Sequence, residues 1–226
     1  MVVISGVGRS GSNLILEVLT GSKFLIPSDP PEDKMVFSRR SMYRNNYLTK
    51  CDLVYTSWSD FSFTMNINPH CKIIYPIRDP RDMAISKIYR GWKKADDATS
   101  GGCIGDLFNM YGFYRLAISH FGDRLLLVKM ENVILDIENE AKRMCRFLEI
   151  EYEENMKYPH TRMRHEGKKN RYKSLDRNQI SMYKKVDTVY DGFFIENKIN
   201  IEYVFRTIAP IVSYFGYNIW IGDNYE

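Results

Sequence analysis

A glycine-rich loop near the start of the chain carries the residues best suited to chemistry. It joins a β-branched run, Val2-Val3-Ile4-Ser5, to an apolar segment that begins near Ser12 and favours a helix. Glycine lets the backbone approach a ligand closely, and the first turn of a helix offers unpaired N–H groups and a positive dipole end. We therefore predict an anion site whose donors are Gly8, Arg9, Ser10, Gly11, Ser12 and Asn13, with Arg9 as a permanent cation inside the loop.

Two phosphate-binding patterns overlap this loop. Gly6 and Gly11 fit the frame G-x-x-x-x-G-K-[ST] of nucleoside-triphosphate sites, but Ser12 stands where that pattern needs Lys. Gly6, Gly8 and Gly11 also spell G-x-G-x-x-G, the dinucleotide fingerprint, which requires an acid at the end of the next strand. Asp29 lies near the end of a candidate strand over 23–26, so a Rossmann-type NAD(P)-dependent oxidoreductase is an alternative.

Residues 72–89 form a second strand–turn–helix pattern. Arg78 ends its apolar run, and open α/β sheets bind ligands at the carboxyl ends of their strands. Asp79 suits the N-cap of the following helix, Pro80 its first position, and Asp82 the acid of a capping box. Arg78 is therefore a candidate anion-binding residue, and the alternative is a local ion pair with Asp79 or Asp82.

Together the two stretches resemble the sulfotransferases that use 3′-phosphoadenosine 5′-phosphosulfate (PAPS). The loop is similar to that family's 5′-phosphosulfate loop, in the R-S-G-[ST] form of the carbohydrate and tyrosylprotein enzymes rather than the Lys form of the cytosolic ones. The second stretch is similar to the 3′-phosphate motif, in which a Ser follows the strand-ending Arg by eight residues. Arg78 and Ser86 match that spacing.

Two later segments also resemble the family. Residues 126–133 look like its strand and acidic corner, with Met130 where the family has Tyr, and the following segment reaches Phe147-Leu148. Residues 165–173 look like the basic loop that closes over the 3′-phosphate. The resemblance assigns cofactor binding there to Arg164, Gly167 and Lys168.

The resemblance implies a reaction as well as a fold. Arg9 is expected to bridge the leaving oxygen and the sulfuryl oxygens of PAPS, so that the product is PAP and no metal is needed. The base is a carboxylate, Asp33 first and then Glu32, because the carbohydrate-type enzymes hold a Glu at that point of the chain. Asp29 and Asp60 are further candidates. A nucleotide-binding protein without catalysis remains a third interpretation.

Apolar and polar segments alternate in an order typical of an α/β fold. We expect strands over 2–5, 23–26, 52–56, 72–77 and 124–129, and helices over 12–20, 38–48, 60–67, 80–94, 104–118, 134–148, 176–187 and 201–215. Strands that alternate with helices predict a parallel sheet covered on both faces. With the resemblance, this gives a P-loop-like three-layer sandwich that forms one domain over 1–226.

Composition limits the partners. The 226 residues have a net charge of +4, but ten basic against two acidic residues between 157 and 185 concentrate the positive charge there. The simplest partner for this basic segment is the donor's 3′-phosphate rather than nucleic acid. The other partner is a small-molecule or carbohydrate acceptor, and the sequence does not indicate an oligomeric state.

Location and metal content can be judged from a few absences in the sequence. No apolar run reaches the 18 residues that would span a bilayer, and the first predicted strand leaves no room for a signal peptide, so we expect a cytoplasmic protein. The four cysteines lack a C-x-x-C pair and are interpreted as reduced, mostly buried thiols. His160 and His165 have no partners at metal-ligand spacing, so no zinc site is expected.

Overall fold

The structure is a computed structural model that describes residues 1–32, 46–52, 62, 66, 68–89, 91, 102–159, 180–185, 191–197 and 199–219. The chain forms two compact units, each described by itself. The first comprises Met1–Arg78 and Phe113–Arg177, and the second comprises Asp79–Gly112 and Asn178–Glu226.

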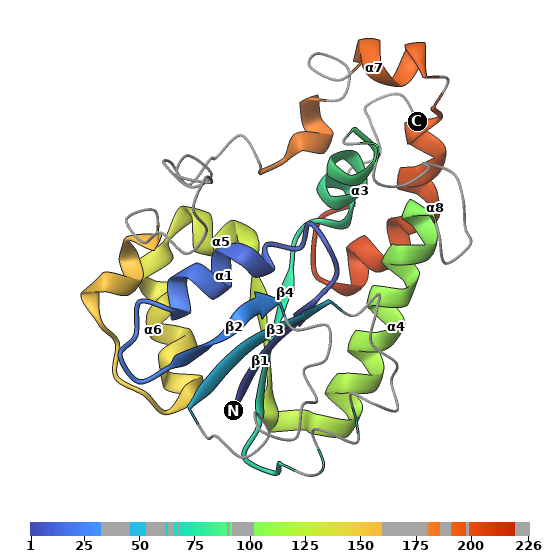
Figure 1. Cartoon of the computed structure of the whole chain (residues 1–226). Coiled ribbons are helices and arrows are strands. Elements are labelled where there is room, and N and C mark those ends of the chain that lie inside the picture. The colour runs from blue at the N-terminus through green and yellow to red at the C-terminus, as the bar shows by residue number, and fades with distance from the viewer. Residues whose placement is uncertain are drawn as a thin grey trace. The chain divides into compact units, whose positions relative to one another are not determined.

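A five-stranded parallel sheet is the centre of the first unit. Its strands lie in the order β2-β3-β1-β4-β5, with β1 in the middle (Figure 1). The bounds are β1 (Val2–Gly6), β2 (Ile26–Glu32), β3 (Tyr47–Asp52), β4 (Lys72–Ile77) and β5 (Leu125–Lys129). All residues of β1 are buried, as expected for a central strand of a parallel sheet that is covered on both faces. The predicted parallel α/β fold is confirmed.

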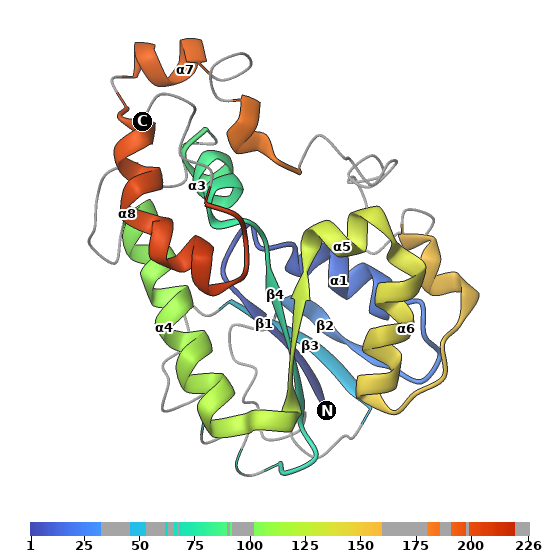
Figure 2. The same ribbon diagram turned by 180° about the vertical axis from the view of Figure 1, so that it is seen from behind.

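Helices cover both faces of this sheet. On one face lie α1 (Ser12–Leu19), α5 (Met130–Leu135) and α6 (Ile137–Leu148), as both ribbon views show (Figures 1 and 2). On the other face lies the end of α4 (Cys103–Phe121), where the ring centroid of Tyr114 is 5.1 Å from that of Tyr75 in β4. Two short 3₁₀ turns, η2 (Gly122–Arg124) and η3 (Glu154–Lys157), complete the described part of the unit.

Two predicted strands are displaced along the chain. The strand expected over 23–26 is β2, Ile26–Glu32, and the one expected over 52–56 is β3, Tyr47–Asp52. β2 contains three prolines, which a sheet tolerates on an edge strand, where fewer ladder hydrogen bonds are needed. The helix expected over 38–48 is wrong at its end, because Tyr47 and Leu48 belong to β3, and its residues before Asn46 lie outside the described ones.

The helix expected over 134–148 is two helices. α5 ends at Leu135 and α6 begins at Ile137, with Asp136 between them. The Asp136 carboxylate accepts a hydrogen bond from the backbone N–H of Asn139 at 3.2 Å, which caps the second helix. The helices expected to start near 12, 80, 104 and 201 are present as α1, α3 (Pro80–Tyr89), α4 and α8 (Ile201–Tyr214). The part of the helix expected over 176–187 that is described forms the 3₁₀ turn η6 (Met182–Lys185).

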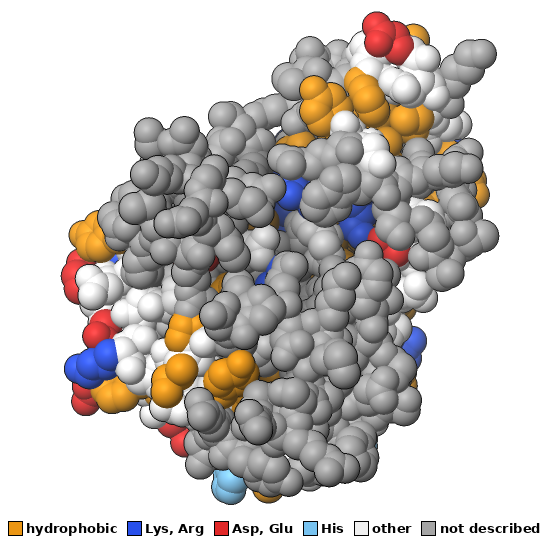
Figure 3. All heavy atoms as spheres, in the orientation of Figure 1, with side chains coloured by type: hydrophobic (Ala, Val, Ile, Leu, Met, Phe, Trp, Pro, Cys, Tyr) orange, Lys and Arg blue, Asp and Glu red, His pale blue; other side chains and the backbone are white. Residues whose placement is uncertain are grey.

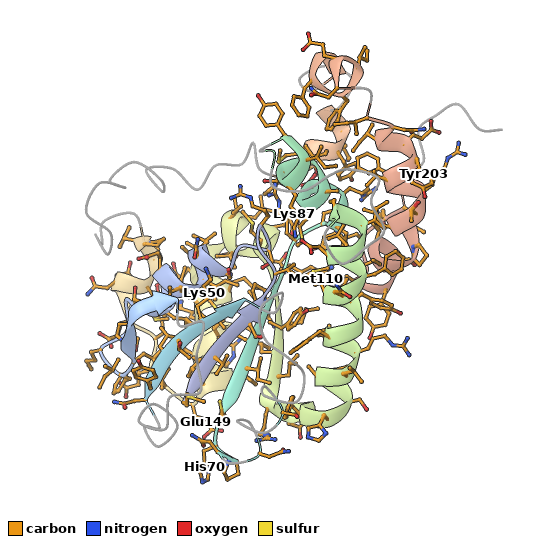
Figure 4. The ribbon with its side chains drawn as sticks, turned by 45° about the vertical axis from the view of Figure 1, so that its right-hand side comes forward. Lys50, His70, Lys87, Met110, Glu149 and Tyr203 are labelled. Carbon is orange, nitrogen blue, oxygen red and sulfur yellow. The ribbon has the colours of Figure 1, made fainter. Side chains whose placement is uncertain are left out.

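The second unit is helical. α3 packs against α8 and against η6, and the start of α4 belongs to the same unit. In its interior the Nζ of Lys87 lies 2.6 Å from Oδ2 of Asp106, and both side chains are buried (Figure 4). The short helix α7 (Asp191–Glu196) carries the exposed Ile195, and apolar side chains gather over it in Figure 3. Among the described helices of both units, none is long and apolar enough to cross a membrane.

Candidate active site

The predicted anion loop joins β1 to α1. It turns tightly, since the N–H of Ser10 donates to the carbonyl of Val7 at 3.2 Å. Arg9 has a φ of 77° and Gly11 a φ of 95°, so the backbone is left-handed on both sides of Ser10. Glycine adopts this region readily, whereas for Arg it costs about 1–3 kcal/mol. Strain of this kind is concentrated at ligand-binding sites, which is consistent with a functional loop.

The start of α1 fits an anion. Gly11 is the N-cap and has no side chain with which to cap the helix, and the first turn contains no acidic residue. The first amides of α1 therefore face the loop without a competing carboxylate, and the helix dipole adds to their attraction for a negative group. Ser12 and Asn13 occupy this first turn, as predicted.

Ser10 is buried under the loop. Its side chain has no exposed surface, and its Oγ has no hydrogen-bond partner among the described residues. A Cβ on Gly6 would lie 2.8 Å from this oxygen and 2.7 Å from Cγ of Pro76 in β4. Gly6 is therefore required by close packing, and this packing places the Ser10 hydroxyl beneath the loop. A ligand oxygen would satisfy it.

Lys50 is a second cation beside the loop. It lies on β3, is 6% exposed, and its Nζ donates to Oδ1 of Asn13 at 2.7 Å (Figure 4). Lys50 is not among the residues predicted from the sequence, because the strand is expected there over 52–56, five residues later than β3. The register of β3 against β1 also brings Asp52 opposite Gly6, at the carboxyl end of the strand. An acid thus ends the strand beside the loop, which sequence reasoning also missed.

Arg78 lies at the same end of the sheet. β4 is the neighbour of β1 on the side away from β3, and Arg78 directly follows it. The residue is 1% exposed although it carries a permanent charge. A buried guanidinium at the carboxyl end of a strand is suited to a phosphate group. Arg78 thus directly follows a strand, as its place after an apolar run predicts, and its binding role stays a prediction.

The corner after β5 reaches the loop as well. A Cβ on Gly11 would lie 2.9 Å from Cγ of Met130, so the Met130 side chain packs directly against the loop. Ile77 of β4 pairs with Lys129 of β5, which brings this corner beside the end of β4. Met130 therefore packs against the loop at Gly11, at the position where the family that the sequence resembles has Tyr.

The start of α3, in the second unit, has the predicted cap. Oδ1 of Asp79 accepts from the N–H of Arg81 at 2.9 Å, and the carbonyl of Asp79 accepts from Met83 at 2.9 Å. Asp79 and Arg81 form an ion pair, in which NH2 of Arg81 lies 2.7 Å from Oδ2 of Asp79. Asp82 accepts from the N–H of Tyr183 at 2.8 Å. Ser86 lies further along α3 and is 4% exposed.

The remaining predicted residues are described in part or not at all. Glu32 ends β2, with its backbone paired with that of Lys50, and Asp29 lies within the same strand. The positions of Asp33, Asp60, Arg164, Gly167 and Lys168 fall outside the described residues. Among the described residues, no group of three His, Cys, Asp or Glu lies close enough together to hold a metal ion.

Comparison with known families identifies the family of this chain. The family described as the sulfotransferase domain matches residues 1–194. The chain belongs to the sulfotransferase family. The identification made from the two motifs is thereby confirmed. No curated protein matches the sequence of this sulfotransferase domain.

Three solved structures share the fold. The sulfotransferase domain of the curacin biosynthetic pathway has a TM-score of 0.65 at 12% identity, over 97% of this chain and 98% of that one. The sulfotransferase domain of the olefin synthase of Synechococcus PCC 7002 has a TM-score of 0.61 at 15% identity, over 96% and 94%. The mouse sulfotransferase SULT7A1, crystallised with PAP, has a TM-score of 0.50 at 16% identity. That match covers 70% of this chain and only 62% of the mouse enzyme.

The topology removes the oxidoreductase alternative. A dinucleotide fingerprint needs the strand that follows the first helix to lie beside β1 and to end in an acid. Here β3 separates β2 from β1, and Asp29 lies inside β2 rather than at its end. The strand order that a Rossmann dinucleotide site requires is therefore absent from the described sheet.

Proposed function

We propose that the protein transfers the sulfuryl group of PAPS to a hydroxyl or amine acceptor and releases PAP. The observation that carries the proposal lies within the first unit. The Arg9 loop, the buried Lys50 and the buried Arg78 occur at the carboxyl ends of β1, β3 and β4, which are adjacent strands. Three cations at one end of a parallel sheet suit a donor that carries two separate anionic groups.

The 5′-phosphosulfate is assigned to the loop. Its donors are the backbone and side chains of Gly8, Arg9, Ser10, Gly11, Ser12 and Asn13. The uncapped amides of α1 and the buried Ser10 hydroxyl support this assignment. Lys50 holds the Asn13 side chain at 2.7 Å and adds positive charge beside it.

The 3′-phosphate is assigned to Arg78 and Ser86, with Arg164, Gly167 and Lys168 as the later contributors. Support comes from the burial of Arg78 at a strand end and from the eight-residue spacing of Arg78 and Ser86, which resembles the family's 3′-phosphate motif. A charge-assisted bond from a buried guanidinium to phosphate is stronger than one between neutral groups. The donor is therefore expected to be recognised chiefly by its two anionic ends.

The reaction is a displacement at sulfur. The acceptor oxygen forms a bond to sulfur while the bond from sulfur to the phosphate oxygen breaks, and a carboxylate takes the acceptor proton. Arg9 neutralises the charge that develops on the leaving oxygen. Asp33 and then Glu32 are the proposed bases. The backbone position of Glu32 opposite Lys50 supports the region in which we place them.

The acceptor is proposed to be a carbohydrate or another small hydroxyl compound, on the R-S-G form of the loop. The charge on a sulfuryl group in transfer is low enough for Arg9, Lys50 and backbone amides to stabilise it, so we propose that no metal takes part. A cytoplasmic location is likewise a proposal.

Calorimetry with PAP and with 5′-AMP tests the assignment. PAP should bind at least about tenfold more tightly, because charge-assisted bonds to the extra phosphate contribute a few kcal/mol that desolvation only partly offsets. The difference should persist in EDTA. Equal affinity for the two nucleotides would contradict the 3′-phosphate site. Discrimination without any turnover of PAPS, across a panel of sugar, phenol and amine acceptors, would favour the non-catalytic nucleotide-binding protein.

A further inference from the structure

A buried charged cluster lies at the start of α3, directly after Arg78. It consists of Asp79, Arg81, Asp82 and Tyr183, all in the second unit. Arg81 is 3% exposed, and Asp79 and Asp82 are 4% and 0% exposed. Burying an ion pair costs more desolvation energy than packing apolar side chains of similar volume. A cluster of this kind beside a binding residue therefore calls for a functional explanation.

Arg81 holds Asp79 with a bidentate contact. Its Nε lies 3.0 Å from Oδ1 of Asp79, and its NH2 lies 2.7 Å from Oδ2. Burial lowers the pKa of Arg81, but the hydrogen bond and the charge of Asp79 outweigh it and raise that pKa above its ordinary value. The guanidinium therefore stays protonated and lies against the Asp79 carboxylate as an ion pair. Without Arg81, a buried carboxylate would stand beside the residue that we assign to the 3′-phosphate.

Tyr183 keeps Arg81 in this position. The guanidinium carbon of Arg81 lies 3.6 Å from the centroid of the Tyr183 ring, and the N–H of Tyr183 donates to Asp82 at 2.8 Å. Stacking on an aromatic face and a bidentate carboxylate together fix the planar guanidinium, which a Lys could not match. Asp82 and Ser86 are four residues apart on α3 and so share one face of the helix. The contacts of the cluster therefore help to hold the part of α3 that also carries Ser86.

We propose that Arg81 is a positioning residue for the 3′-phosphate: it cancels the charge of Asp79 next to Arg78 and is held in place by Tyr183. This inference rests on the proposed function, since it assumes that Arg78 and Ser86 bind that phosphate. It adds a residue that lies between the two proposed phosphate ligands, Arg78 and Ser86, and whose role is electrostatic. A merely structural role would lower stability but would leave the preference for the 3′-phosphate unchanged.

Four proteins test this role by calorimetry with PAP and 5′-AMP. In Arg81→Gln the uncancelled charge of Asp79 should weaken PAP binding by about tenfold and 5′-AMP binding by less than about twofold. In the double variant Asp79→Asn with Arg81→Gln, the charge is removed again and PAP affinity should return to within about threefold of the parent. Asp106→Asn is the matched control, because it breaks the other buried ion pair of the unit, Lys87–Asp106. It should lower stability but leave PAP affinity unchanged.

Three results would overturn the inference: full PAP affinity in Arg81→Gln, an equal loss for both nucleotides, or no recovery in the double variant. If Arg81→Gln does not fold, Asp79→Asn decides, since Asn also caps helices well. It removes only the negative charge, so it should bind PAP at least as tightly as the parent, and a tenfold loss would overturn the inference. A parent protein that does not distinguish PAP from 5′-AMP would instead overturn the proposed function, and the inference with it.

Discussion

Arg9 combines a left-handed backbone with the charge that the reaction needs. Its φ of 77° is unfavourable for any residue with a Cβ, so the loop geometry is maintained by its surroundings rather than by Arg9 itself. Those surroundings are the packing of Ser10 under Gly6 and of Met130 under Gly11. The side chain of Arg9 therefore contributes chemistry rather than shape, which makes its removal informative.

Replacing Arg9 by Ala should lower the rate of sulfuryl transfer by about 10²–10³-fold, with a much smaller effect on PAP affinity. Arg9→Gly should be equally slow. It should also be at least as stable as Arg9→Ala, although Gly ordinarily costs about 0.5–1 kcal/mol relative to Ala. Steady-state kinetics and urea unfolding of the two variants measure both effects. An Arg9→Ala protein with the full rate would contradict the assigned role, and a less stable Arg9→Gly protein would contradict the φ argument.

The proposed base requires a separate residue-scale test. Asp33→Asn should lower sulfuryl transfer by about 10²–10⁴-fold, the range for loss of a general base, and keep PAP binding within about twofold. Glu32→Gln should do so instead if Glu32 is the base. A substantial rate in both variants would exclude the pair. Asp52→Asn would then be examined next, because the register places Asp52 opposite Gly6, with Asp29 and Asp60 after it.

At the scale of elements, the loop depends on two glycines whose environments differ from those of other glycines in the chain. A Cβ at position 6 would meet the Pro76 ring at 2.7 Å, whereas a Cβ at Gly112 in α4 would meet nothing within 4 Å. Gly6 and Gly112 therefore form a matched pair for the same substitution by Ala.

Gly6→Ala should therefore lower the free energy of unfolding by about 1–3 kcal/mol, as overpacking does in a buried site. It should also weaken PAP binding, because Ser10 must move. Gly112→Ala should raise the free energy of unfolding by about 0.5–1 kcal/mol, since Ala is the better helix former. Urea unfolding of both variants measures whether the free energy of unfolding falls, as expected for Gly6→Ala, or rises, as expected for Gly112→Ala. An unchanged free energy of unfolding in Gly6→Ala would show that close packing against Pro76 of β4 does not hold the loop in place.

The elements that could be predicted from sequence are those whose signal is local. β1 is an apolar run that ends at a glycine, and β4 is an apolar run that ends just before a capped helix. The positions of both strands follow from residues only a few places away in the sequence. The loop between β1 and α1, and Arg78 directly after β4, therefore lie where the sequence pattern predicts them. The same holds for Asp79 as a cap, because Asp-Pro before an apolar stripe is a strong helix-start signal.

Strands whose predicted bounds were wrong are held in place by residues far away in the sequence. Residues 53–56 look more like a strand than Tyr47–Asp52, yet the latter pairs with β1. Lys50 is unfavourable in a strand, and it is stabilised by Asn13, a residue 37 positions away. Likewise, the buried Arg81 packs against the ring of Tyr183, which lies about a hundred residues later in the chain. Such residues have no signature in a single sequence, since their partners are set only by the topology.

At the scale of the whole molecule, buried thiols are distributed over both units. Cys71 and Cys145 lie in the first and Cys103 in the second, and these three described cysteines are buried thiols outside any disulfide, as predicted. Burial raises the pKa of Cys71 to about 12, although the positive charge of Arg124 partly opposes it. Burial likewise raises the pKa of Cys145 to about 11. The folded protein thus holds protons that the unfolded chain releases at lower pH.

This difference predicts how stability falls in alkali. A raised folded pKa stabilises the protein below the unfolded pKa, about 8.5 for Cys, and the stabilisation is lost as pH rises toward the folded value. Cys71→Ala should be less stable than the parent at pH 7, because it leaves a small cavity. Above about pH 9 the difference should shrink by at most about 1.4 kcal/mol per pH unit, since only the parent has that thiol to ionise. Cys145→Ala should behave similarly but over a narrower pH range, because the pKa of the Cys145 thiol in the folded protein is lower than that of Cys71.

Urea unfolding at pH 7, 9 and 10.5 under reducing conditions measures the difference in stability between each variant and the parent. A constant gap between parent and Cys71→Ala would show that the thiol ionises equally in both states, and hence that the start of β4 is less tightly packed than its burial indicates.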